Sequence, residues 1–159
     1  MDFRHQQGAR RNGVNFSDSA LARASSGKKV GVYSERVKQL VAELRFSGRL
    51  KNPTHVGESS NPICGDVTRF ELNVLNDRVT GCRFLATGCV AAIAAAAALA
   101  RLCQKQPVKT CLGITTEDLL ADLDPLPRHK LHAIQLALDA LHKALRKPHG
   151  VSDLIYPAP

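Results

Sequence analysis

The chain has 159 residues, 44% of them hydrophobic and only 4% aromatic, and a formal net charge of +8 at pH 7. This length suits one domain with its own core, and the scarcity of aromatic rings argues against nucleic-acid recognition by base stacking. No apolar run is long enough to cross a membrane, so we expect no membrane as a partner. We also expect no nucleic acid as a partner. The five cysteines are an odd number, which disfavours a disulfide framework and favours a reducing compartment with metal or thiol chemistry.

The first 29 residues hold half of the net charge, with six Lys and Arg side chains against two Asp side chains. This segment is polar and has no periodicity. We therefore predict a disordered basic leader over residues 1–29, a folded domain over residues 30–147 and a tail over residues 148–159. We expect a cytoplasmic protein. If the leader is a mitochondrial transit peptide, which its Arg and Ser content resembles, the protein belongs in the mitochondrial matrix.

The folded domain starts with a predicted helix capped by Ser34. Its apolar residues fall at helical spacing on one face: Val37, Leu40, Val41 and Leu44. Glycines and prolines then follow one another across residues 47–63, which predicts a loop.

Two alternating segments come next and predict an antiparallel hairpin with a turn at Asn76-Asp77. The first, residues 66–74, places Phe70, Leu72 and Val74 on one face. The second, residues 79–86, places Cys82 and Phe84 on one face.

The second half of the chain predicts three helices. Residues 89–103 are almost unbroken alanine, the best helix former, and their small side chains allow close packing. Thr115 opens a short helix, with Asp118 in a capping-box position. A last helix starts near His129 and carries an apolar stripe: Leu131, Ile134, Leu138, Leu141 and Leu145. This order predicts an α+β fold with helices on one face of a small antiparallel sheet.

Four candidate metal ligands fall at the ends of predicted elements, namely Cys64, Asp66, Cys89 and His132. A thiol at a helix N-terminus, as expected for Cys89, has a lowered pKa and is more readily a thiolate. Two thiolates with an imidazole and a carboxylate suit zinc or an exchangeable iron–sulfur site. On residue types alone, a second interpretation remains open, in which Cys64 and Cys89 are simply small buried residues.

Five further residues are candidates for supporting the site or relaying sulfur. Gly65 and Gly88 lack side chains, so backbone N–H groups can approach a sulfur or a metal. His129 and Lys130 precede His132 by three and two residues. Cys111 lies in a predicted loop, from which its thiol can swing toward the site.

Several segments resemble the NifU/IscU-type iron–sulfur cluster assembly scaffolds. Residues 61–66 (NPICGD) look like that family's Pro-x-Cys-Gly-Asp motif. Residues 84–94 (FLATGCVAAIA) resemble its Gly-Cys followed by a small-residue helix. Residues 126–132 (LPRHKLH) are similar to its Leu-Pro-Pro-x-Lys-x-His-Cys run, and residues 33–37 (YSERV) look like its first helix. The resemblance runs in the family's order over roughly residues 33–146.

The resemblance implies a sheet of about three antiparallel strands and a scaffold, not an enzyme, that assembles a [2Fe–2S] cluster and transfers it. Carried over residue by residue, Cys64, Asp66, Cys89 and His132 line the site, and Asp66 tunes the lability of the cluster. The implied partners are a cysteine desulfurase, an Hsp70-type chaperone at Leu126–Lys130 and apo iron–sulfur client proteins.

The chain departs from the family at the position after His132, where Ala133 replaces the third cysteine, a principal sulfur acceptor in the family. The chaperone-recognition run also differs, at Arg128 and His129. Two alternatives therefore stand beside the scaffold. One is a zinc-binding sulfur-transfer protein of the same fold, and the other is a degenerate paralogue that serves as an interaction module.

Overall fold

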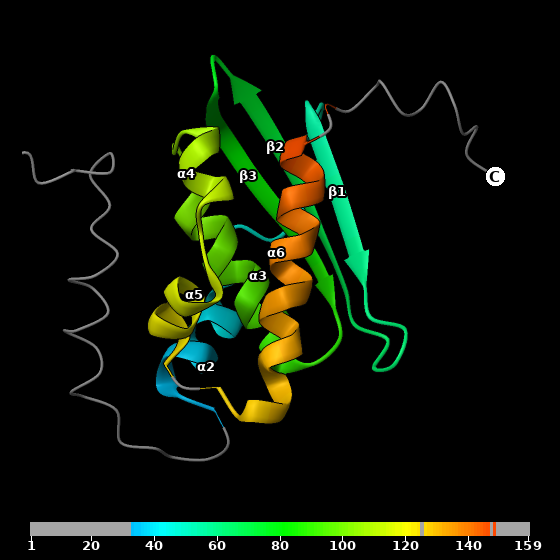
Figure 1. Cartoon of the computed structure of the whole chain (residues 1–159), viewed down its shortest axis with the longest axis vertical. Helices are drawn as coiled ribbons and strands as arrows, with labels where there is room; N and C mark the ends of the chain where they lie inside the picture. Colours follow the sequence, from blue (N-terminus) through cyan, green and yellow to red (C-terminus); the bar gives the residue numbers. More distant parts are fainter. Residues whose placement is uncertain (1–32, 125, 147, 149–159) are drawn as a thin grey trace, which may run out of the picture.

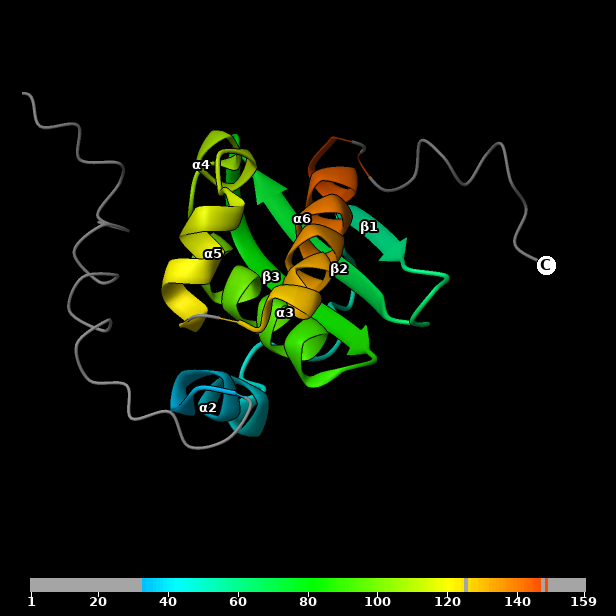
Figure 2. The same ribbon diagram turned by 60° about the horizontal axis from the view of Figure 1, so that its bottom comes forward.

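The computed structural model describes residues 33–124, 126–146 and 148. In this part of the chain, α-helices, a 3-10 helix and β-strands follow one another in the order α2 (Glu35–Glu43), β1 (His55–Ser60), β2 (Val67–Leu75), β3 (Arg78–Thr87), α3 (Val90–Cys103), α4 (Val108–Leu112), α5 (Thr116–Leu123), η1 (Arg128–Lys130) and α6 (Leu131–Arg146). The three strands form an antiparallel sheet in the order β1-β2-β3, and α3 and α6 lie across one face of it (Figures 1 and 2). The α+β prediction is confirmed.

The predicted hairpin is present as β2 and β3. Asn76 and Asp77 connect the strands with φ values of 50° and 56°, and two positive φ values in succession are typical of the tight turns that join twisted strands. Phe70, Leu72 and Phe84 are at most 1% exposed and form the inner face of the sheet beneath the helices.

The loop predicted over residues 47–63 is wrong in its second half, because His55–Ser60 forms strand β1. This segment lacks the apolar alternation of a strand, and its inward-facing residues include Gly57 and Ser59. Its position depends on α6 instead: a Cβ atom added to Gly57 would strike backbone atoms of Ala140 and Ala144. Strand β1 is thus a product of tertiary packing against a helix.

The helices correct the sequence prediction in three places. Leu44 does not extend α2, since it caps that helix with φ 41° and is 40% exposed. Leu131 begins α6 but is 37% exposed, so the buried stripe starts one turn later. Cys111 lies in α4, not in a loop. The Ser34 cap of α2 and the Thr115 capping box of α5 are confirmed.

Both edges of the sheet carry hydrogen bonds from other parts of the chain. At β3, the amide of Phe84 donates to the carbonyl of Phe46 at 3.0 Å, and Gln104 Nε2 donates to the carbonyl of Cys82 at 2.6 Å. At β1, Lys143 Nζ donates to the carbonyl of Glu58 at 3.2 Å. The ends of the strands, by contrast, lead into loops and helix starts.

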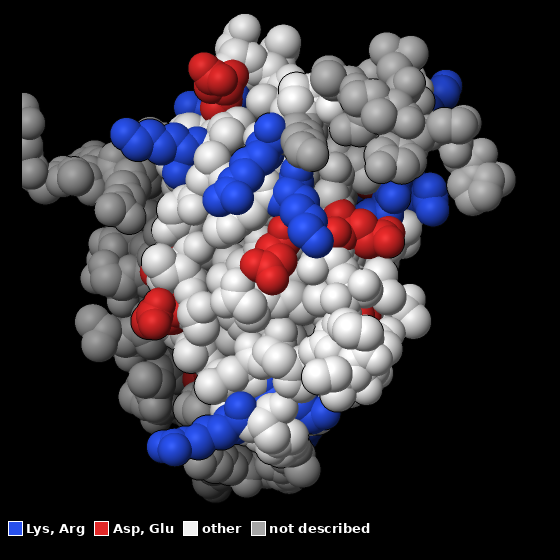
Figure 3. Space-filling model, turned by 45° about the vertical axis from the view of Figure 1, so that its right-hand side comes forward, with Lys and Arg blue, Asp and Glu red and all other residues white. Residues whose placement is uncertain are grey.

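Charge is unevenly spread over the face of the molecule that Figure 3 turns forward. Charged side chains of both signs gather in its upper part and basic ones at its lower end, and the centre of the face between them is uncharged. No helix in the described ranges is both long and apolar enough to cross a membrane. The predicted leader and all of the predicted tail except Pro148 lie outside the described residues.

Candidate metal centre

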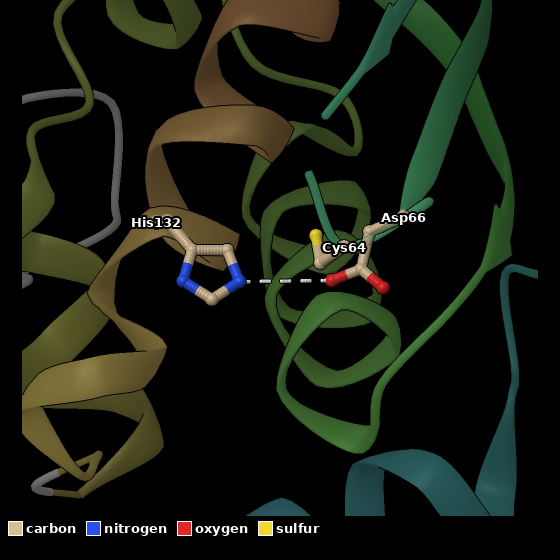
Figure 4. Close-up of side chains that lie close together, drawn as sticks. All are labelled: Cys64, Asp66 and His132. Carbon is tan, nitrogen blue, oxygen red and sulfur yellow. Dashed lines mark ion pairs between the residues drawn. The ribbon is translucent and has the colours of Figure 1, made fainter. Parts of the chain in front are cut away.

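The four candidate ligands converge at one end of the sheet from three parts of the chain. Cys64 and Asp66 come from the loop between β1 and β2, Cys89 from the junction of β3 and α3, and His132 from the first turn of α6. The ligand atoms of Cys64, Asp66 and His132 all lie within 4.8 Å of one another (Figure 4). The structure therefore brings together residues that are 68 positions apart in the chain, from Cys64 to His132.

Asp66 connects the fourth candidate, Cys89, to Cys64 and His132. Its Oδ2 accepts a hydrogen bond from Cys89 Sγ at 3.2 Å, and its Oδ1 accepts one from the backbone N–H of Cys89 at 3.0 Å. The same Oδ2 lies 3.8 Å from His132 Nε2. The carboxylate, which is 2% exposed, is the centre of the site.

The pKa of Asp66 reflects two opposed effects. Burial raises it, but the hydrogen bonds from the thiol and the backbone of Cys89, the Cys64 thiol and the nearby His132 outweigh burial and hold the pKa below its usual value. Asp66 is therefore an anion at neutral pH, and it supplies the negative charge that a cation would meet.

Cys89 behaves differently from the sequence prediction. It is the N-cap residue of α3, as expected, but its pKa is raised. Burial is the main cause, and the hydrogen bond and negative charge of Asp66 add to it. The backbone N–H of Ala92 and the positive charge of Lys130 lower the pKa by less. The prediction of a lowered pKa is wrong because burial of the thiol, together with the facing Asp66 carboxylate, outweighs the groups that lower the pKa.

Only one of the two candidate glycines makes room for the Asp66 carboxylate. A Cβ atom at Gly88 would collide with the Asp66 side chain, and Gly88 has φ +140°, which L side chains rarely adopt. Gly65 has φ +74°, but a Cβ atom there would meet nothing within 4 Å. Gly88 therefore provides room for Asp66, whereas Gly65 serves only the turn of its loop.

Asn61, which was not among the predicted site residues, shapes the loop that carries Cys64. Its side-chain Oδ1 accepts the N–H of Ile63 at 3.0 Å, and its carbonyl accepts the N–H of Gly65 at 2.8 Å. Its own N–H donates to the carbonyl of Asp66 at 2.8 Å. The signal was available, because an Asn that precedes Pro is a common turn former.

One ring nitrogen of His132 is placed as expected for a metal ligand. Its Nε2 atom is buried, has no hydrogen-bond partner among the described residues and lies on the Asp66 side of the ring. A buried polar atom without a partner is costly, and coordination of a metal would satisfy it. The four donors, two sulfurs, a nitrogen and an oxygen, fit zinc or a mixed-ligand iron–sulfur cluster.

The remaining candidates are placed less centrally. Lys130 acts on Cys89 through its charge, while His129 is exposed in η1. Cys111 is fully buried, and its Sγ donates to the carbonyl of Cys103 at 3.9 Å, at the C-terminal end of α3. That end is about 20 Å from Cys89 along the helix axis, so the structure does not bring Cys111 to the site. Ala133 is also fully buried and adds no donor.

Comparisons with known proteins identify the family of this chain. A model of the NifU-like N terminal domain matches residues 32–151. The chain is 41% identical over 114 residues to a bifunctional protein NifU/MnmA of Rubrobacter xylanophilus, covering 70% of this chain but only 23% of that protein. It is 34% identical over 116 residues to an iron-sulfur cluster assembly scaffold protein IscU of Aquifex aeolicus, covering 72% of this chain and 74% of that protein.

Solved structures show the same fold. The N-terminal part of a nitrogen-fixing NifU-like protein from Brucella abortus superposes with a TM-score of 0.63 at 16% identity, covering 72% of this chain and 92% of that one. A putative scaffold protein for the SUF system from Fervidobacterium islandicum gives a TM-score of 0.58 at 18% identity, covering 72% and 96%. By its sequence match over most of its length, this chain belongs to the family of NifU-like N-terminal domains.

Proposed function

We propose that this protein is a scaffold on which an iron–sulfur cluster is assembled and from which the cluster is passed to recipient proteins. The observation that carries the proposal is the convergence of the ligand atoms of Cys64, Asp66 and His132 within 4.8 Å of one another. The Cys89 thiol joins them through its hydrogen bond to Asp66. A relative of similar sequence that is named an iron-sulfur cluster assembly scaffold protein IscU supports it. Such a protein holds and releases its cargo and turns over no substrate of its own.

The finer proposal is a [2Fe–2S] cluster held by Cys64, Cys89 and His132, with Asp66 as the fourth ligand. Thiolates are the usual ligands of such clusters, and histidine replaces cysteine in some of them. A carboxylate is a harder ligand than a thiolate and suits iron–sulfur units less well, which favours release. To bind, Cys89 must lose its proton and exchange its hydrogen bond to Asp66 for a bond to iron.

The proposed partners are a cysteine desulfurase as the sulfur source, apo iron–sulfur proteins as recipients and an Hsp70-type chaperone. The chaperone would bind at Leu126–Lys130, just before the helix that carries His132. Leu126 is 7% exposed, whereas Arg128 and His129 are exposed. A partner at this run would therefore meet its basic side chains first. The cytoplasm, proposed from the cysteine usage, is the place where these partners would act.

Zinc-dependent sulfur transfer is the second candidate function. The donors that would hold a cluster are also zinc ligands, since thiolate, imidazole and carboxylate all occur in tetrahedral zinc sites. The third possibility is an interaction module without metal. It does not explain why the Nε2 atom of His132 is buried without a hydrogen-bond partner among the described residues. Metal content distinguishes the three.

The test is anaerobic purification followed by analysis of iron, zinc and labile sulfide, and then reconstitution with ferrous iron and inorganic sulfide. We expect a visible chromophore that is lost in Cys64→Ala and His132→Ala. His129→Ala is the matched control, because this exposed imidazole lies three residues from His132 and should leave the chromophore intact. Stoichiometric zinc that iron does not displace would favour the second candidate. A folded chain that takes up neither metal would overturn both.

A further inference from the structure

A second group of thiols lies at the end of α3 that is remote from the metal centre. Cys82 on β3, Cys103 at the C-terminus of α3 and Cys111 in α4 are at most 2% exposed. The length of α3 separates Cys103 from Cys89 by about 20 Å. The proposed chemistry of the metal centre therefore gives these three thiols no role.

Two of the three thiols, those of Cys103 and Cys111, contact each other. The thiols share a hydrogen bond, and Cys111 Sγ also donates to the carbonyl of Cys103 at 3.9 Å. The chain between them turns back with Lys105 at φ 58°, which lets α4 pack against the end of α3. Two thiols that are already hydrogen-bonded need only a short approach of their sulfur atoms to form a disulfide.

The shared hydrogen bond gives the two thiols different reactivity. It lowers the pKa of Cys111 against the effect of burial, and it raises the pKa of Cys103, where burial acts in the same direction. The thiolate is the nucleophile in cysteine chemistry, so Cys111 reacts with an oxidant first and Cys103 second. Burial raises the pKa of Cys82, which stays a thiol and takes no part.

Helix α4 is only a thin cover over Cys111. Among the five residues of this helix, Cys111 alone is buried, and its neighbour Leu112 is 37% exposed. A helix this short has little stability of its own, so it opens locally more readily than the core does. Such an opening is wide enough for a molecule as small as hydrogen peroxide to reach the thiol.

We propose that Cys103 and Cys111 are a redox-active pair that hydrogen peroxide converts into a reversible disulfide. The Cys111 thiolate attacks one peroxide oxygen, the O–O bond breaks, and the hydroxide that leaves takes up a proton to give water. Cys103 gives up its proton and attacks the sulfenic sulfur of Cys111. The S–S bond forms, the S–O bond breaks, and a second water leaves. The two thiols lose two electrons, which reduce one peroxide to two waters.

The test uses the metal-free full chain, whose accessible thiols are first alkylated with iodoacetamide in the folded state. Hydrogen peroxide is added, the remaining thiols are blocked with N-ethylmaleimide in urea, and tryptic peptides are analysed by mass spectrometry without reduction. Cleavage after Arg101, Lys105 and Lys109 places the two cysteines on separate peptides, 102–105 and 110–128. We expect these peptides to be joined, about 2 Da lighter than their sum, and to be separated by dithiothreitol.

Cys82→Ala is the matched control, because it removes the third buried thiol and should keep the joined peptides. Cys103→Ser should leave a sulfenic acid on Cys111 that dimedone traps, and its absence would overturn the order of the two steps. In the wild type, free thiols at both positions after peroxide, a disulfide that includes Cys82, or a sulfinic acid on Cys111 beside a free Cys103 would each overturn the pair. These wild-type results hold even if a variant fails to fold.

Discussion

Asp66 carries a buried negative charge, and the other polar groups of the site are arranged around it. It accepts hydrogen bonds from the backbone and the thiol of Cys89 and lies beside His132. The sequence indicated Asp66 as a ligand through its place beside Cys64. It did not indicate that Asp66 orients Cys89 before any metal binds, because that contact joins residues 23 positions apart.

Removing this charge should make Cys89 more reactive. Burial and then Asp66 raise the pKa of Cys89, so Asp66→Asn should lower the pKa, and its amide can still accept the backbone N–H of Cys89. We expect faster alkylation of Cys89 by iodoacetamide at pH 8, about tenfold for each pKa unit recovered. Peptide mass spectrometry measures the rate, and the exposed turn variant Asp77→Asn serves as the control. An unchanged rate in Asp66→Asn would contradict the assignment.

The lowered pKa of Asp66 also predicts a dependence of stability on pH. A group whose pKa is depressed by folding contributes stability above its unfolded pKa, about 3.9, and this stability is lost as the pH falls through the folded pKa. The free energy of unfolding of the wild type should therefore fall more steeply below about pH 4 than that of Asp66→Asn. Urea unfolding at a series of pH values measures both slopes. Parallel curves would show that Asp66 is not stabilised as an anion.

Gly88 and Gly65 provide a matched pair of backbone tests. Gly88→Ala should cost about 1 to 3 kcal/mol in backbone strain and should also displace the Asp66 side chain, so metal binding should weaken. Gly65→Ala should cost about 1 kcal/mol and leave Asp66 in place, because its Cβ atom enters open space. Chemical unfolding and metal titration of both variants give the comparison. Equal metal affinity in the two would rule out the steric role of Gly88.

At the level of elements, the sequence predicted those whose own pattern determines them. The β2–β3 hairpin follows from its alternation, and α3 follows from its run of alanines. Strand β1 and helix α4 were missed, since both depend on neighbours that are remote in sequence. His55–Ser60 is polar and joins the sheet by packing on α6, while the five residues of α4 are too few to show a periodic face.

The contact between β1 and α6 predicts the strongest effect on stability. In Gly57→Ala the new Cβ atom lies 2.7 Å from Ala144 Cα and closer still to the backbone of Ala140, so strand and helix must separate. We expect a loss of about 3 kcal/mol in the free energy of unfolding. Gly81→Ala on β3 is the control, because its nearest neighbour is a flexible Leu50 side-chain atom at 3.9 Å. Similar losses in the two variants would show that β1 does not depend on this approach.

At the level of the whole molecule, the site joins the loop before β2, the start of α3 and the start of α6. The sequence placed each candidate ligand in the loop before a strand or near the start of a helix, where the structure also has it. It could not supply their mutual distances, which depend on how α6 crosses the sheet. A metal at this point would link all three segments, so binding and global stability should be coupled.

This coupling predicts that zinc raises the melting temperature of the metal-free protein. A ligand at about one hundred times its Kd stabilises the folded state by about 2.7 kcal/mol, which corresponds to a shift of several degrees in a domain of this size. His132→Ala should lose most of the shift, and His129→Ala should keep it. Differential scanning calorimetry with and without zinc measures the effect. Equal shifts in the two variants would place the bound zinc elsewhere.

The hydrogen bonds along the outer strands have a consequence for handling such a protein. An uncovered strand is a template on which a second molecule can add its own strand, and this is how many β-rich proteins begin to aggregate. Here Phe46 and Gln104 cover part of β3, and the ammonium group of Lys143 lies against β1. The molecule can therefore leave the Cys64 thiol and the apolar Ile63 side chain exposed near one end of its sheet while parts of both outer strands are covered.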